Sequence, residues 1–147
     1  MKKLIAISLI LHLFGCIDES SLKPIIPYHV LHANSSKVWI LQKRFVNGED
    51  IAPQLRERKR TFTFFDDLQL VEQEMVHLGS NYGLLASYSI RIDESMRDTL
   101  LNFYYTNHNK KLKFKVNEIG YKILKLHPIT ADSIVEEWHL IPLNKSN

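Results

Sequence analysis

Short segments rich in β-branched and aromatic residues recur from Lys37 to Ile141, and turn residues separate each from the next. This spacing is typical of an all-β sandwich or barrel, and it restricts the fold more than any other feature of the chain. No window has the sustained 3.6-residue apolar period of an amphipathic helix. The expected strands are Lys37–Val46, Thr61–Phe64, Leu68–His77, Leu84–Ile92, Thr99–Thr106, Lys111–Val116, Tyr121–Leu126 and Ser133–Ile141.

The connections between these segments predict how the strands are arranged. Turn dipeptides and tripeptides such as Asn47-Gly48, Asp66-Asp67 and Asn107-His108-Asn109 join them. Sequential strands with short turns usually pair as antiparallel neighbours, and closing the sheet removes both exposed edges. The sequence therefore predicts an antiparallel up-and-down β-barrel of about eight strands.

The N-terminus carries a separate signal. Met1-Lys2-Lys3 precedes an apolar stretch from Leu4 to Phe14, whose eleven residues span about half of a bilayer core as a helix. A positive start and a short apolar stretch are the anatomy of a signal peptide. The stretch ends in Leu13-Phe14-Gly15-Cys16, which resembles the lipobox of bacterial lipoproteins. The resemblance implies cleavage after Gly15 and lipidation of Cys16 by diacylglyceryl and acyl groups such as palmitate.

The expected organisation is a signal peptide over residues 1–15, a lipidated N-terminus and tether over 16–36, and the barrel over 37–147. Serine, proline and asparagine without a sustained period indicate the tether, of which the part from Ile25 to Leu31 could lie against the domain. Ile17 is not the aspartate that marks inner-membrane retention in enterobacterial lipoproteins, so the outer membrane is favoured. Asp18-Glu19 resembles an acidic surface-export signal, and it is equally consistent with a solvated tether, so the periplasmic and cell-surface sides both stay open.

Charge and cysteine content exclude other classes of protein. The net charge of +3 includes Lys2 and Lys3, which leave with the signal peptide, so the mature chain is close to neutral. A nucleic-acid partner is not expected, because binding of that kind needs a strong positive field. With one cysteine in the chain, no internal disulfide can form.

Five segments between Lys37 and Ile141 follow one another in a characteristic order. They are Lys37-Val38-Trp39-Ile40-Leu41, Thr61-Phe62-Thr63-Phe64-Phe65-Asp66-Asp67, Tyr88-Ser89-Ile90-Arg91-Ile92-Asp93, Tyr121-Lys122-Ile123-Leu124-Lys125-Leu126 and Asp132-Ser133-Ile134-Val135. In these segments the mature sequence resembles the lipocalin-like lipoproteins of Bacteroidetes. The resemblance implies an eight-stranded barrel that either holds a small apolar ligand or is filled by its own side chains.

Aromatic residues on the expected strands supply most of the volume for a core. At period-two spacing such residues more often form core than line a ligand pocket. If a pocket exists, its expected lining is Trp39, Phe62, Phe64, Phe103, Phe114 and Trp138.

Polar residues give weaker signals. Glu72 and Glu74 share a strand face, and an exposed face is favoured over acid–base work inside a barrel. His29 and His32 lack the further ligands of a zinc site, so no metal and no cofactor is expected. Two basic clusters could contact anionic lipid headgroups, although a solvated surface is favoured. They are Arg56, Arg58, Lys59 and Arg60, and Lys110, Lys111, Lys113 and Lys115.

The leading hypothesis is a non-enzymatic, membrane-anchored envelope lipoprotein whose barrel binds a small hydrophobic ligand. The alternative is a protein-interaction module of an envelope or secretion assembly. No Gly-x-Ser-x-Gly elbow, glycine-rich phosphate loop or cysteine nucleophile supports an enzyme. Catalysis in the mouth of the barrel would need converging polar groups with shifted pKa values.

Overall fold

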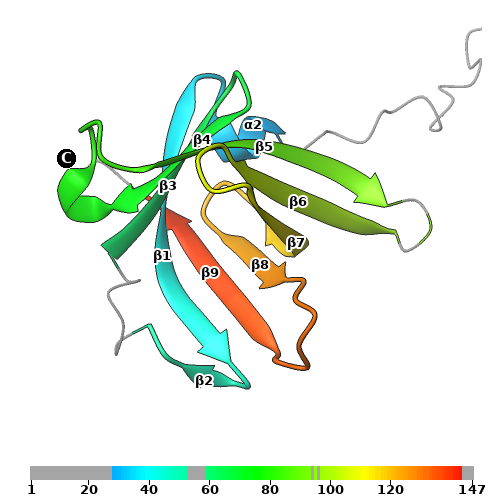
Figure 1. Ribbon diagram of the computed structural model, residues 1–147. Coiled ribbons are helices and arrows are strands. Elements are labelled where there is room, and N and C mark those ends of the chain that lie inside the picture. Colours follow the sequence, from blue (N-terminus) through cyan, green and yellow to red (C-terminus); the bar gives the residue numbers. More distant parts are fainter. Residues whose placement is uncertain (1–27, 53–58, 94, 96, 144–147) are drawn as a thin grey trace, which may run out of the picture.

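The computed structural model describes residues 28–52, 59–93, 95 and 97–143, and it is a closed antiparallel β-barrel (Figure 1). Eight strands follow one another round the barrel in chain order, and β1 pairs with β9 to close it, so the predicted up-and-down barrel is confirmed. The elements are α2 (Tyr28–His32), β1 (Ser36–Val46), β2 (Glu49–Asp50), β3 (Arg60–Phe65), β4 (Gln69–Glu74), the 3-10 helix η3 (Met75–His77), β5 (Leu84–Asp93), β6 (Asp98–Tyr105), β7 (Lys110–Ile119), β8 (Leu124–Pro128) and β9 (Glu136–Pro142).

The one extra strand is β2, which the sequence did not predict. It pairs with the end of β1 through a two-residue turn at Asn47 and Gly48, whose φ angles are 50° and 89°. Two successive positive φ angles are the geometry that an Asn-Gly dipeptide adopts most readily between strands. The turn residues were therefore identified correctly, and the short strand behind them was too brief to give a period-two pattern.

Four predicted strands have different limits in the structure. The segment Lys111–Val116 extends as β7 to Ile119. The segment Leu68–His77 ends as a strand at Glu74, and its last three residues form η3. Strand β8 starts at Leu124 because Tyr121 and Lys122 belong to a turn that the Gly120 N–H closes on the Ile123 carbonyl. Strand β9 likewise begins only at Glu136.

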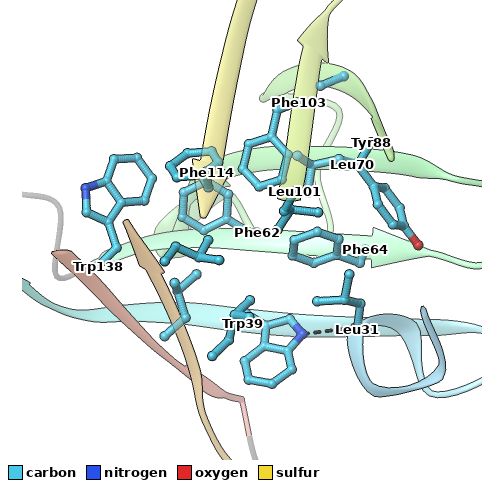
Figure 2. Close-up of a cluster of buried hydrophobic side chains, with 14 of the residues drawn as sticks. Leu31, Trp39, Phe62, Phe64, Leu70, Tyr88, Leu101, Phe103, Phe114 and Trp138 are labelled. Atoms are coloured by element: carbon cyan, nitrogen blue, oxygen red, sulfur yellow. Dashed lines mark hydrogen bonds between the residues drawn. The ribbon is translucent and has the colours of Figure 1, made fainter. Parts of the chain in front are cut away.

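Helix α2 closes one end of the barrel, although its residues lie in the segment 16–36 that the sequence assigns to a tether. Leu31 is fully buried, and its carbonyl accepts a hydrogen bond of 2.9 Å from Trp39 Nε1 (Figure 2). Tyr28 packs its ring on Tyr88, and its hydroxyl accepts a hydrogen bond from the Ile90 N–H. This part of the segment therefore belongs to the folded domain.

Aromatic side chains fill the barrel from α2 upward (Figure 2). Phe64 packs against both Tyr88 and Phe103, with ring centroids 5.0 and 5.8 Å apart. Phe103 continues the contact to Phe114 at 5.0 Å, and Phe114 continues it to Trp138 at 5.2 Å. The core is thus one column of rings, with Trp138 at the end opposite α2.

We expect Trp39→Phe to destabilise the barrel by about 1–3 kcal/mol, because it leaves the buried Leu31 carbonyl without its donor. The free energy of unfolding in urea measures this loss. Tyr121→Phe is the control, since Tyr121 is 74% exposed at the same end. Equal stability of the two variants would contradict a closing role for the Trp39 hydrogen bond.

Candidate ligand site at the mouth of the barrel

A cavity of about 790 Å³ lies at the end of the barrel opposite α2. Phe114 and Trp138, the last rings of the core, border it. On one side the barrel wall is incomplete, because the pairing of β8 with β9 stops at Leu126 and Trp138. The other described residues that line the cavity are Arg44, Arg60, Glu72, Leu84, Tyr105, His108, Asn109, Lys110, Lys111, Leu112, Lys113, Pro128, Ile129, Thr130 and Glu136.

A β-bulge in β1 turns Arg44 toward this cavity. Side chains alternate between the two faces of a strand, so the inward Leu41 would normally be followed inside by Lys43 and Phe45. The register of β1 on β9 shifts between Leu41 and Lys43, and the extra residue reverses the alternation. Arg44 consequently lies opposite the inward Trp138, while Phe45 packs outside the barrel.

Arg44, Glu136 and Trp138 form the first polar cluster of the cavity. Arg44 Nε lies 2.5 Å from Glu136 Oε1, and the same oxygen accepts a hydrogen bond from Trp138 Nε1. The Glu136 side chain is 12% exposed. Burying a carboxylate is unfavourable unless the charge is paired and hydrogen-bonded, and these two contacts meet that requirement. Trp138 therefore belongs both to the apolar core and to the polar mouth.

Arg60, Glu72 and Tyr105 form the second polar cluster. The Tyr105 hydroxyl donates to Glu72 Oε2, and Arg60 Nε lies 3.3 Å from Glu72 Oε1. Burial and the adjacent Glu72 carboxylate raise the pKa of Tyr105 above its ordinary value. The expectation of an exposed face is wrong for Glu72, which is 8% exposed inside the barrel. Glu74 is exposed, because β4 ends there.

Lysines from the start of β7 add further positive charge. Lys110, Lys111 and Lys113 all border the cavity, and none lies within 4 Å of a carboxylate of a described residue. Lys110 shares the inward face of Tyr105, whereas the Lys111 ammonium packs over the outer Tyr104 ring at 4.9 Å. The Lys110 ammonium lies 5.9 Å from the centre of the Tyr105 ring. Part of the second basic cluster predicted from the sequence thus lies at the mouth, next to the polar cluster of Arg60, Glu72 and Tyr105.

Two of the six aromatic residues expected to line a pocket do so, namely Phe114 and Trp138. The other four are at most 1% exposed and belong to the packed core: Trp39, Phe62, Phe64 and Phe103. The polar residues of the two clusters were missed as site residues. The signal for Arg60 was its place two residues before Phe62, on the same strand face.

Several other expectations concern residues away from the cavity. Cys16, Arg56 and Arg58 lie outside the described residues. His29 and His32 pack ring to ring at 5.7 Å, and within the described ranges no three histidine, cysteine or acidic side chains gather as a metal site would need. The described part of the chain holds no helix that is long and apolar enough to span a membrane.

Comparison of the chain with models of protein families, with curated proteins and with solved structures gives no match.

We expect Tyr105→Phe to flatten the loss of stability at alkaline pH. A group whose pKa is raised on folding stabilises the barrel below its unfolded pKa, near 10 for tyrosine, and this contribution disappears as the pH rises further. Unfolding free energies between about pH 9 and pH 11 test the effect. Tyr104→Phe, on the outer face, should instead steepen the loss, because the hydrogen bond with Ser89 lowers the pKa of Tyr104 and its ionisation therefore adds stability as the pH rises.

Proposed function

We propose that this protein is a lipid-anchored component of the bacterial cell envelope whose barrel binds a small molecule at its mouth. The observation that carries the proposal is the cavity of about 790 Å³ between two ordered polar clusters, above an aromatic floor. Small-molecule sites typically have this size, with apolar walls and a few polar groups that fix the orientation of the ligand.

The ligand would occupy the outer part of the barrel. Its apolar portion would lie on Phe114 and Trp138, whereas the four deeper aromatic residues keep their structural role. The polar groups favour binding over catalysis, because Glu72 and Glu136 are each already engaged by an arginine and an aromatic donor. Neither a metal nor an organic cofactor is part of this proposal.

The lipidated Cys16 would attach the protein to the membrane, with the outer membrane as the proposed location. Eleven residues separate Cys16 from Tyr28, and such a segment reaches at most about 40 Å when extended. Tyr28 begins α2, at the closed end of the barrel, so an anchor that precedes it in the chain would leave the mouth accessible. Two or three acyl chains give stable membrane attachment.

The anchor is tested by Cys16→Ala in a bacterial host fed labelled palmitate. We expect the wild-type protein to carry the label and to stay with the membrane fraction, because the thiol accepts the diacylglyceryl group. The variant should lose both properties. A labelled variant, or an unlabelled wild-type protein, would contradict the anchor.

The ligand is tested by native mass spectrometry of residues 17–147, which include every described element, after incubation with an envelope lipid extract. We expect the wild-type barrel to retain a small-molecule adduct. Leu84→Trp should abolish it, because Leu84 faces the cavity opposite Glu72 and a larger ring would occupy the space. Leu85→Trp is the matched control, since Leu85 is the next residue and is 54% exposed on the outer face.

A second candidate function is protein interaction within an envelope assembly. The observation that favours it is a run of exposed apolar side chains between the end of β4 and the start of β5, namely Met75, Val76, Tyr82 and Leu85. Exposed apolar patches are typical of interaction sites. A wild-type barrel that retains no adduct in the mass spectrum contradicts the ligand role and favours this second one.

A further inference from the structure

The charges around the mouth are unequal. Three cationic side chains, Arg44, Arg60 and Lys110, lie at the cavity against two carboxylates, and both carboxylates are bound by arginines. We propose that the cavity binds a compact organic anion, with Arg60 and Lys110 holding its anionic group and the aromatic floor holding its apolar body. This inference rests on the proposed ligand role of the mouth, and it names the chemical class of the ligand.

Arg60 is prepared for such a group by the residues behind it. Its Nε is the atom closest to Glu72 Oε1, at 3.3 Å, while Glu72 Oε2 is occupied by the Tyr105 hydroxyl. A guanidinium carries five N–H donors in a rigid planar fork, so one carboxylate oxygen cannot satisfy them all. The side chain is 38% exposed at the cavity wall, and with respect to the described residues its remaining donors are available to an anion there.

Lys110 supplies the second positive charge at the same place. It pairs directly with Tyr105 across β6 and β7, and its ammonium lies 5.9 Å from the centre of the Tyr105 ring. Tyr105 therefore connects the two cations: its hydroxyl donates to Glu72, the partner of Arg60, and its ring lies next to the Lys110 ammonium. An anionic group above Tyr105 would meet an arginine and a lysine together, in a partly desolvated wall where such contacts are strengthened.

The filled core limits the shape of the apolar body. Phe62 and Phe103, directly beneath the mouth, are at most 1% exposed, and the ring of Phe62 lies 5.9 Å from that of Trp138. A long acyl chain would need a channel through this column of rings. The cavity of about 790 Å³ instead lies beside Leu112, Phe114 and Trp138, where a fused-ring or aryl acid would fit.

A matched pair of probes tests the inference: 8-anilinonaphthalene-1-sulfonate and N-phenyl-1-naphthylamine share one aromatic body and differ by the sulfonate. We would titrate each into residues 17–147 by calorimetry. The sulfonate should bind at least about tenfold more tightly to the wild-type barrel, since a charge-assisted hydrogen bond is worth about that factor. Arg60→Gln should remove this advantage and leave the affinity for the uncharged probe within about twofold.

Two further variants complete the test. Lys110→Gln should weaken sulfonate binding because it removes one of the two positive charges. It should not destabilise the fold, because both arginine–glutamate pairs remain. Arg97→Gln is the control, because Arg97 is exposed in the turn between β5 and β6, at the closed end. Equal affinity for the two probes, or sulfonate binding unchanged in both Arg60→Gln and Lys110→Gln, overturns the inference and leaves the ligand role standing. If neither probe nor the envelope extract yields a complex, the ligand role fails as well.

Discussion

Closure of eight strands into one barrel forces side chains from every strand to share a narrow interior, and the rest of the structure follows from how that interior is filled. An eight-stranded barrel has just enough room for its own side chains or for one small ligand. In this protein both occur at different levels along the barrel axis. Aromatic rings from Phe64 to Trp138 fill the part nearer α2, and the cavity lies at the opposite end. Helix α2 makes the division possible, because Leu31 and Trp39 seal the end where packing is complete.

The two arginine–glutamate clusters are costly as structural elements alone. Buried ion pairs lose solvation, and apolar residues of similar volume are often equally or more stabilising in their place. Glu72 and Glu136 are nevertheless held at low exposure, each by an arginine and by the polar end of an aromatic side chain. Tyr105 and Trp138 thereby tie the polar mouth to the apolar core, so that the arginines keep fixed positions at the cavity wall.

The fold was predictable from the sequence because each strand repeats the same period-two pattern, and the short turns leave few alternative topologies. Most of the polar mouth was predictable by the same rule: Arg60 shares its strand face with Phe62, Glu72 with Leu70, and Glu136 with Trp138. Polar residues were interpreted as exposed. This interpretation fails near the mouth, where the inward-facing positions of a strand are polar because they lie beyond the packed core. Arg44 was different, because a bulge reverses its face and β1 contains no glycine that would indicate a bulge in the sequence. Helix α2 was missed because five residues are too few to reveal a helical period.

The bulge in β1 links the fold to the chemistry of the mouth. Without it, Lys43 would face inward and Arg44 outward, and Glu136 would meet a flexible ammonium instead of a planar guanidinium. Trp138 donates to Glu136 and closes the aromatic column, so the position of that carboxylate affects both halves of the barrel. One inserted residue thus fixes the position of Arg44, the partner of Glu136 and the orientation of the ring at the cavity floor. The register of β1 on β9 is therefore a constraint on the site as well as on the closure of the sheet.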